Sequence, residues 1–317
     1  MADWRQPYPS FTKTYHHDQY PAIDPKQAAL NCSKKIVLIT GAGRGIGQAI
    51  AIAFAQASAK GIALLGRTKS TLEETAAKVK EVNSTTDVFI TTADITSQPS
   101  VQASMDSVVS HFSAVPDVLV NNAGGAMGRG VLIDVDLSEF WKCQHLNILG
   151  PLTVSQAFLR ANRTHTPDTP RTIINLPSGA AHLPYSPGGA AYMTSKLAST
   201  KITEILHYEH PEWNIFNMQP GVVATDLARE AGRKAPDDPR LPAGMAVWLS
   251  AHPEARELNG RFVWANWDVN ELLGRKEEIQ KGSLLNMWLR GWAEGVSAEE
   301  LMGTAKSLIG NAQQKKE

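Results

Sequence analysis

The sequence predicts an α/β protein built on a doubly wound, mostly parallel sheet of seven strands. Short apolar, β-branched runs alternate with longer segments of helical periodicity, and the connections between them are short. That alternation is typical of βαβ units whose helices cover both faces of a parallel sheet. A glycine-rich stretch also separates the first strand from the first helix. No linker or internal repeat divides residues 34–270, so we expect a single domain there.

Each expected strand is a short apolar run, and each expected helix is a longer segment with helical spacing of its apolar residues. The first strand, KKIVLIT, has four consecutive apolar residues, as is usual in strands buried on both faces. The helix STLEETAAKVKEV opens on Ser70 and Thr71 as capping residues, with glutamates in its first turn. Strands are expected at residues 34–40, 61–67, 87–94, 116–124, 171–178, 213–221 and 260–266. Helices are expected at residues 46–60, 70–82, 97–112, 138–161 and 189–209.

Segments outside this pattern lie at both ends of the chain. Residues 1–33 form an irregular N-terminal arm with many aromatic residues, so we expect it to lie on the body of the protein. A flexible tail is the alternative. Residues 271–317 are expected to be a C-terminal helical extension of two or three amphipathic helices, with a break near Lys281 and Gly282.

The composition excludes several classes of protein. The 31 basic and 31 acidic residues cancel, which gives no electrostatic reason to expect nucleic acid or a membrane surface as partner. No apolar run approaches the roughly 20 residues of a membrane helix, and the N-terminus lacks the apolar core of a secretory signal. Two cysteines, Cys32 and Cys143, imply no disulfide framework and fit a reducing compartment. We therefore expect a cytoplasmic protein. His16 and His17 have no further ligands at metal spacing, so no metal site is expected.

The glycine-rich stretch TGAGRGIG, residues 40–47, joins the first strand to the first helix. Glycine permits a tight turn and a close approach of the backbone to a pyrophosphate, and the helix beyond presents unpaired N–H groups and the positive end of its dipole. Because the stretch follows a strand and begins a series of βα units, it predicts a Rossmann-type dinucleotide site rather than a turn that serves packing alone. The residues expected to bind the cofactor here are Gly41, Gly43, Arg44, Gly45, Ile46 and Gly47.

The residues after the second strand favour NADP(H) over NAD(H). Sites for NAD(H) usually carry an acidic residue at the end of this strand, where it binds the adenosine ribose. Here the strand ends LLGRTKS, and no Asp or Glu follows before Glu73. Two guanidinium groups, from Arg67 and Arg44, suit a 2′-phosphate, and Thr68 would add a hydroxyl. We expect NADP(H), with NAD(H) as the less favoured alternative.

The third strand ends in TADIT, which contains Asp94 and Ile95. A carboxylate at this position can accept a hydrogen bond from the adenine amino group, and Ile95 would pack on the ring. A cap for the next helix is the alternative role for Asp94.

Further motifs follow the glycine loop in order. NNAG stands at Asn121–Gly124, Asn147 lies in the long expected helix, and Ser178 follows the fifth strand. YMTSK occupies residues 192–196, and PGVVAT residues 220–225. With this ordered set, the chain resembles the short-chain dehydrogenase/reductase family from about residue 35 to residue 225. The arm and the tail are similar to those of a subgroup common among fungal NADP(H)-dependent members.

The resemblance implies a catalytic role for four residues. Tyr192 would donate a proton to a carbonyl oxygen or accept one from an alcohol. Lys196, four residues further on the same helix face, would lower the pKa of this tyrosine from its reference value near 10 and hold the nicotinamide ribose. Ser178 would steady the developing oxyanion, and Asn147 would keep a water joined to Lys196. A turn serine and an interior amide satisfied by the backbone are the alternatives for the last two.

The resemblance also implies further cofactor contacts. Asn121, Ala123 and Gly124 would pack against the adenosine and ribose side, and Val223 and Thr225 would meet the nicotinamide carboxamide. The residues that complete the expected cofactor site are Tyr192, Lys196, Pro220 and Gly221. The chain departs from the family pattern at Pro177, in its gap of 14 residues from Ser178 to Tyr192, and in lacking a Gly-Gly ending.

Substrate choice is expected to come from residues 124–130, residues 178–189 and a candidate lid at residues 226–242. The lid segment is long, polar and proline-bearing, as mobile active-site loops often are. Such walls would suit a hydrophobic ketone. The side chains expected to form the walls are Met127, His182, Leu183, Tyr185 and Leu227.

The sequence as a whole predicts an NADP(H)-dependent oxidoreductase that transfers a hydride between nicotinamide and a carbonyl or alcohol substrate. An isomerase, dehydratase or cyclase-like enzyme on the same scaffold is one alternative, and a non-catalytic dinucleotide sensor is another. Ser178, Tyr192 and Lys196 argue against a sensor, which has no need of them. By analogy with the family, we expect a homodimer or homotetramer.

Overall fold

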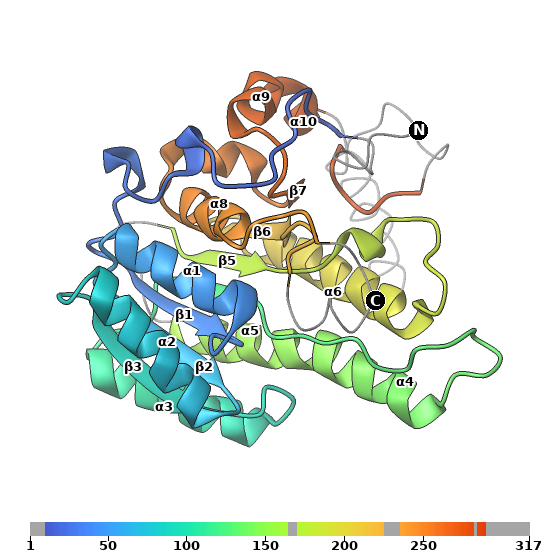
Figure 1. The fold of residues 1–317 in the computed structure, drawn as a ribbon, viewed down its shortest axis with the longest axis horizontal. Coiled ribbons are helices and arrows are strands. Elements are labelled where there is room, and N and C mark those ends of the chain that lie inside the picture. Colours follow the sequence, from blue (N-terminus) through green and yellow to red (C-terminus); the bar gives the residue numbers. More distant parts are fainter. Residues whose placement is uncertain (1–9, 164–169, 225–234, 282–283, 290–317) are drawn as a thin grey trace, which may run out of the picture.

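The computed structural model of the 317-residue chain describes residues 10–163, 170–224, 235–281 and 284–289. Its centre is a seven-stranded sheet in the order β3-β2-β1-β4-β5-β6-β7, and every adjacent pair is parallel. The predicted doubly wound sheet is therefore confirmed (Figure 1). The strands are β1 (Ile36–Thr40), β2 (Gly61–Gly66), β3 (Asp87–Thr92), β4 (Val118–Asn121), β5 (Thr172–Asn175), β6 (Asn214–Gln219) and β7 (Phe262–Trp264).

Helices cover both faces of the sheet (Figure 1). One face carries α1 (Gly45–Gln56), α2 (Lys69–Val82) and α8 (Arg240–Ala251). The other face carries α3 (Gln98–Phe112), α4 (Leu137–Gln144), α5 (Gly150–Ala161) and α6 (Ala190–Glu209). Successive residues of β1 enter different cores, because strand side chains alternate between faces: Val37 and Ile39 pack on the α1 side, and Leu38 on the α3 side.

The chain order reverses between β1 and β4, which lie side by side in the middle of the sheet. Connections leave the carboxyl ends of these two strands in opposite directions, so a crevice opens outside them. The loops after β1, β4, β5 and β6 all begin at this edge. The functional residues predicted on those loops are thereby brought together.

The expected long helix is interrupted by a π-helical turn at His145–Leu149, between α4 and α5. Gly150 N–H donates to the carbonyl of His145, five residues back. Pro151 explains the turn, because it has no N–H and cannot donate to the carbonyl of Asn147 in the α-helical pattern. Single π turns of this kind often occur at functional sites.

Helix α8 is an element that the sequence analysis missed. The candidate lid was placed at residues 226–242, but residues 240–242 open α8, and Leu241 is fully buried. Pro242 is tolerated there because the first turn of a helix needs no N–H donors. The remainder of the candidate lid that the structure describes, residues 235–239, forms a short connection held by Asp237 and Asp238. Residues 226–234, including Leu227, lie outside the described residues.

The N-terminal arm packs on the body, as predicted, over its described residues 10–33. Tyr20, Ile23 and Leu30 are buried in the core on the α8 side. The carbonyl of Ile23 lies 2.5 Å from where a Cβ on Gly244 of α8 would stand, so only glycine permits this approach. Figure 1 shows the arm, in dark blue, running beside α8 and α9 (Val269–Gly274). The short 3-10 turns of the arm are η1 (Pro21–Ile23) and η2 (Ala28–Leu30).

The C-terminal extension begins with α9 and continues into α10 (Lys276–Lys281). Asp268 caps α9 by accepting hydrogen bonds from the backbone N–H groups of Asn270 and Glu271, both at 3.0 Å. Residues 290–317 lie outside the described residues. Within the described ranges, no helix has the length and apolar character that crossing a membrane requires.

Candidate active site

The glycine loop crosses from β1 to α1 at the carboxyl edge of the sheet. Gly41 and Gly45 have φ angles of +65° and +57°, in the region that side-chain-bearing residues avoid. A Cβ on Gly47 would stand 2.3 Å from the carbonyl oxygen of Gly41, so the first turn of α1 lies directly against the loop. These glycines let the loop form a tight cradle at the N-terminus of α1, where Arg44 and Gly45 are exposed. This is the arrangement that a pyrophosphate requires.

Two residues that the sequence analysis did not single out hold this loop in place. The Thr40 hydroxyl accepts hydrogen bonds from the backbone N–H groups of Asn122 and Ala123, each at 3.0 Å. The Asn122 side-chain amide donates to the carbonyls of Thr40, at 2.8 Å, and Gly41, at 3.1 Å. These bonds tie the end of β4 to the glycine loop. The feature of the sequence that could have indicated this role is Asn122, the second asparagine of NNAG, which caps no helix.

The side chain of Asn121, a residue predicted to pack against the adenosine and ribose side, is directed into the protein interior. Its side chain is buried and donates to the Ser155 hydroxyl of α5 at 2.8 Å. Alternation along a strand explains the difference, because Asn121 and Asn122 point to opposite sides. Ala123 and Gly124, the other two predicted residues of this motif, lie at the crevice, and Gly124 is exposed.

The predicted phosphate-binding arginines lie on adjacent loops at the same edge. Arg44 is the N-cap residue of α1, and Arg67 follows β2 directly; both side chains are exposed. A Cβ on Gly43 would stand 2.3 Å from the Thr71 hydroxyl, so the glycine loop touches the first turn of α2, which Thr68 precedes. The sheet edge therefore presents two cations beside the cradle, with no carboxylate at the end of β2.

Asp94 and Ile95, predicted to contact the adenine, differ in exposure. The Asp94 carboxylate is exposed and accepts hydrogen bonds from the N–H and hydroxyl of Thr96, at 2.9 and 2.7 Å. These bonds, with a smaller contribution from Arg67, lower the pKa of Asp94 below its ordinary value. Ile95 is buried, and its side chain packs against Gly150 at the start of α5. Its side chain therefore lies beneath the crevice.

Tyr192 and Lys196 occupy one face of the first two turns of α6. The Lys196 ammonium lies 5.7 Å from the centre of the Tyr192 ring and donates to the carbonyl of Leu176 at 3.1 Å. Lys196 is only 6% exposed, and its burial lowers its pKa from 10.5 to about 8. The α6 backbone here is braced by the Ser195 hydroxyl, which donates to the carbonyl of Tyr192 at 2.8 Å.

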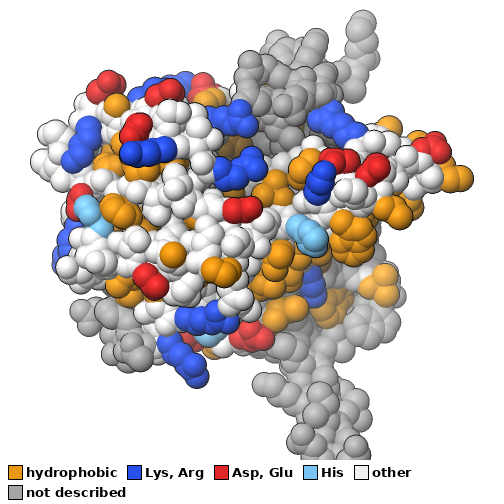
Figure 2. All heavy atoms as spheres, turned by 90° about the horizontal axis from the view of Figure 1, so that it is seen from below, with side chains coloured by type: hydrophobic (Ala, Val, Ile, Leu, Met, Phe, Trp, Pro, Cys, Tyr) orange, Lys and Arg blue, Asp and Glu red, His pale blue; other side chains and the backbone are white. Residues whose placement is uncertain are grey.

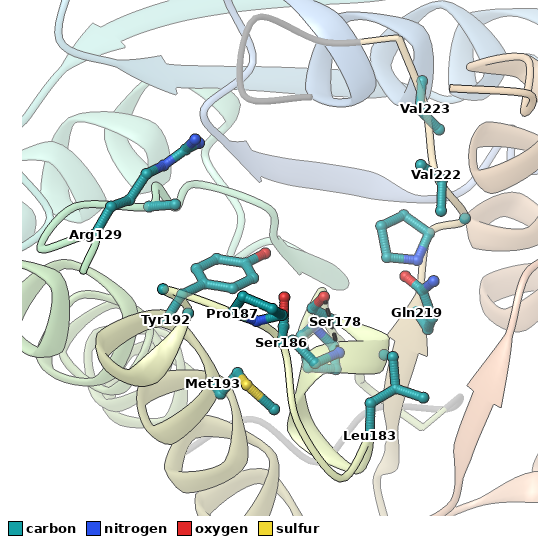
Figure 3. A pocket seen from close by; sticks show the side chains of 18 of the residues that line it. Arg129, Ser178, Leu183, Ser186, Pro187, Tyr192, Met193, Gln219, Val222 and Val223 are labelled. Carbon is teal, nitrogen blue, oxygen red and sulfur yellow. Dashed lines mark hydrogen bonds between the residues drawn. The ribbon is translucent and has the colours of Figure 1, made fainter. Parts of the chain in front are cut away.

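Ser178 lies at the N-terminus of a 3-10 turn, η4 (Gly179–Ala181), just after β5. Its oxygen accepts a hydrogen bond from the backbone N–H of Ala180 at 3.2 Å. The serine is thus a turn residue, yet it also lines a pocket together with Tyr192. Figure 3 shows the hydroxyls of Ser178 and Tyr192 directed into the same space. The two roles are compatible, because a hydroxyl that accepts one bond can still donate another.

Asn147 lies in the π turn and is 1% exposed. Its side chain binds both backbone groups of Gly125, accepting from the N–H at 3.1 Å and donating to the carbonyl at 2.8 Å. The Asn147 side chain therefore has the role given above as the alternative, that of an interior amide whose hydrogen bonds are made to the backbone. Its oxygen and the Lys196 ammonium lie 2.9 and 3.2 Å from where a Cβ on Gly124 would stand. The residue thus faces Lys196, and Pro151 leaves its carbonyl without an α-helical donor.

The pocket beside these residues has a volume of about 240 Å³. Two predicted segments line it: residues 124–130 contribute Met127 and Arg129, and residues 178–189 contribute Leu183 and several others. The side chains of His182 and Tyr185 do not line it, although His182 accepts a hydrogen bond at 3.1 Å from the Trp264 indole, which does. Lining residues outside the segments predicted for the substrate pocket are Met193, Gln219, Val222 and Trp264.

The turn after β6 forms the wall opposite Tyr192 (Figure 3). Pro220, Gly221, Val222 and Val223 line the pocket, and Gly221 has a φ angle of +90°. Thr225, predicted to contact the nicotinamide, lies outside the described residues. The described part of the chain contains no cluster of three or more metal-ligating side chains.

Three comparisons with known proteins agree with this geometry. The family model described as short chain dehydrogenase matches residues 35–236. The short chain dehydrogenase mpl6 of Monascus purpureus is 35% identical over 285 residues, 86% of this chain and 94% of that protein. The short chain dehydrogenase pigC of Monascus ruber is 34% identical over 290 residues, which cover 87% of this chain and 92% of that protein. Among solved structures, the Pseudomonas aeruginosa RhlG/NADP complex superposes with a TM-score of 0.67 at 23% identity, over 75% of this chain and 97% of that one.

Proposed function

The chain belongs to the short-chain dehydrogenase family of oxidoreductases, which bind a nicotinamide dinucleotide, and from this premise we propose that it is an NADP(H)-dependent carbonyl reductase or alcohol dehydrogenase. The observation that carries the proposal is the shared pocket of Tyr192 and Ser178, with the buried Lys196 behind it. A phenol and a hydroxyl converge there on one cavity, and a cation lies 5.7 Å from the centre of the phenol ring. This set can bind a carbonyl oxygen and move a proton to it.

The cofactor preference rests on the residues around the glycine cradle. A Cβ on Gly41, Gly43 or Gly47 would collide with neighbouring protein atoms, so these glycines let the loop fold tightly at the N-terminus of α1, where a pyrophosphate would bind. Arg44 and Arg67 flank the cradle and would bind a 2′-phosphate, whereas an acidic side chain after β2 would repel it.

The chain's own residues would act as follows. When bound, the dinucleotide supplies or takes up the hydride. Ser178 donates a hydrogen bond to the substrate oxygen, and Tyr192 delivers the proton to that oxygen in reduction. Lys196, held by the carbonyl of Leu176, favours the tyrosinate through its charge and so brings this proton transfer within reach of neutral pH. Asn147 holds the Gly124–Gly125 backbone against Lys196.

The pocket favours a substrate with an apolar body. Met127, Leu183, Met193 and Trp264 supply apolar surface. Among the described residues that line the pocket, Arg129 alone carries a charge. A hydrophobic ketone, or the corresponding alcohol, fits these walls best.

We propose a homodimer or homotetramer that pairs through α4–α5 and α6. Figure 2 shows hydrophobic side chains gathered over α4 and α5. Trp141 is 57% exposed on α4, and Leu197 and Ile205 are 44% and 46% exposed on the neighbouring α6. Apolar surface of this kind is typical of an interface.

We also propose a cytoplasmic location, since Cys32 and Cys143 are buried thiols outside any disulfide.

The test combines binding with turnover. NADPH and NADH are titrated by nicotinamide fluorescence, and absorbance then follows NADPH oxidation with a panel of ketones and quinones. Tyr192→Phe should bind NADPH nearly as the native enzyme does and lose roughly a hundredfold or more in turnover, because the proton donor is gone. Tyr185→Phe removes an exposed phenol outside the pocket and is the matched control. Unchanged turnover in Tyr192→Phe would refute the assigned chemistry.

A further inference from the structure

We propose that His17, on the N-terminal arm, is a positioning residue of the pocket: it holds the Asp237 carboxylate, which in turn fixes the Pro220–Val223 turn. The role of that turn beside the nicotinamide rests on the proposed function. The contacts themselves are independent of it. The arm thus acts on the wall opposite Tyr192 from about 200 residues away in the sequence.

Asp237 is the centre of the arrangement. Its side chain is 1% exposed, and one carboxylate oxygen accepts a hydrogen bond from the backbone N–H of Val222 at 2.5 Å. The backbone N–H of Asp237 donates to the carbonyl of Val222 at 3.2 Å, and Val223 pairs with Asp237 in a short parallel bridge. A Cβ on Gly221 would stand 2.6 Å from the same carboxylate oxygen. The turn is therefore built around this side chain.

His17 satisfies the other carboxylate oxygen. Its Nδ1 lies 2.5 Å from Asp237 Oδ1, and its backbone carbonyl accepts from the N–H of Asp238 at 2.8 Å. A buried carboxylate is costly unless hydrogen-bond donors reach its oxygens. Here the Val222 amide serves one oxygen and the His17 ring the other. Loss of the ring would let water reach Asp237 or let the carboxylate move, and either change loosens the bond to Val222.

The consequence for the site follows from where the turn lies. Gly221, Val222 and Val223 form one wall of the pocket, and Figure 3 shows Val222 and Val223 across the cavity from Tyr192. The side chains of residues 221–223 cannot hold this backbone in place themselves, because Gly221 has no side chain and the two valines form no side-chain hydrogen bonds. His17 therefore sets the distance between the two walls without itself lining the pocket.

His16 provides a matched control on the same arm. Its ring lies 3.0 Å from the Asp268 carboxylate and stacks on Tyr20. Asp268 caps α9, and among the described residues its side chain is hydrogen-bonded to His16, Asn270 and Glu271 rather than to the turn after β6. His16→Ala thus removes a similar His–Asp contact and loosens the arm, but it leaves Asp237 in place.

The experiment compares His17→Ala, His17→Asn and His16→Ala by amide hydrogen exchange, with mass spectrometry on peptides that cover residues 218–224. An asparagine at position 17 places a donor N–H where Nδ1 stands. We expect exchange of the Val222 amide to rise roughly tenfold in His17→Ala, to return close to the native rate in His17→Asn, and to stay native in His16→Ala. The KM for the carbonyl should rise in His17→Ala alone.

Exchange that is equal in His17→Ala and His16→Ala, or unchanged in both, would overturn the proposal. If His17→Ala does not fold, His17→Gln replaces it, because its donor lies one bond further out; equal exchange in the Asn and Gln variants would then overturn it. The exchange measurement needs neither cofactor nor substrate. If the native enzyme consumed no carbonyl substrate, the proposed function would be refuted, but the exchange comparison of the His17 and His16 variants could still be interpreted.

Discussion

Replacing Lys196 with methionine should alter stability in a way that depends on pH. Burial lowers the pKa of Lys196 from 10.5 to about 8, so the charged form costs the folded protein about 3 kcal/mol at pH 7. Methionine removes that cost but leaves the carbonyl of Leu176 without its donor, which costs about 1–2 kcal/mol. We expect Lys196→Met to be more stable than the native protein by about 1–2 kcal/mol at pH 7, although it should be inactive.

The sign of the pH dependence provides the stricter test. Between pH 8 and 10.5 the unfolded chain holds a proton on Lys196 that the folded chain has lost, so native stability rises with pH in this range. The advantage of the methionine variant should therefore shrink by about 2 kcal/mol between pH 7 and 9.5. Urea unfolding at several pH values, followed by tryptophan fluorescence, measures it. Lys60→Met, at an exposed lysine, should show no such change. A constant difference for Lys196→Met over this range would refute the lowered pKa.

Three further predictions concern other parts of the site. Arg67→Asp should weaken NADPH binding roughly 10- to 100-fold and NADH binding far less, measured by fluorescence titration; equal losses would remove the 2′-phosphate assignment. Gly47→Ala brings a methyl group to 2.3 Å from the carbonyl of Gly41, so it should destabilise the fold by about 1–3 kcal/mol in urea unfolding and abolish dinucleotide binding. Gly274→Ala, with open space at its Cβ, should have neither effect. Leu197→Asp should dissociate the oligomer in light scattering, and an unchanged mass would place the interface elsewhere.

The strands and the glycine loop were predictable because their signals are local. A buried parallel strand must be apolar on both faces, and β1 is recognised from its own residues. A loop that meets a phosphate must contain glycine where a Cβ would collide, as at Gly41 and Gly47. The pairing of Tyr192 and Lys196 needs only the helical repeat. Each of these features can be identified within fewer than ten residues.

Helix α8 was missed for a physical reason. Its first turn contains Pro242, and Gly244 follows, so its helical propensity is low. What stabilises it is burial: Trp248 is fully enclosed, and the helix packs between α1 and the arm. Tertiary packing of this kind has no local signature, and a polar, proline-bearing start resembles a loop.

The role of the residues that hold the site's loops was also not predictable, even for Asn147, which was predicted in another role, and the reason is general to this architecture. Backbone that faces a ligand must carry small side chains, so it cannot fix its own position. Gly41 is therefore held by Asn122, Gly125 by Asn147, and the turn at Gly221 by Asp237 and His17. Each of these supporting residues lies between 15 and about 200 positions along the sequence from the loop that it holds. A sequence motif identifies the loop, whereas only the fold shows which distant residue holds it. Variants at His17 or Asn122 should therefore change the site even though neither residue belongs to the catalytic set.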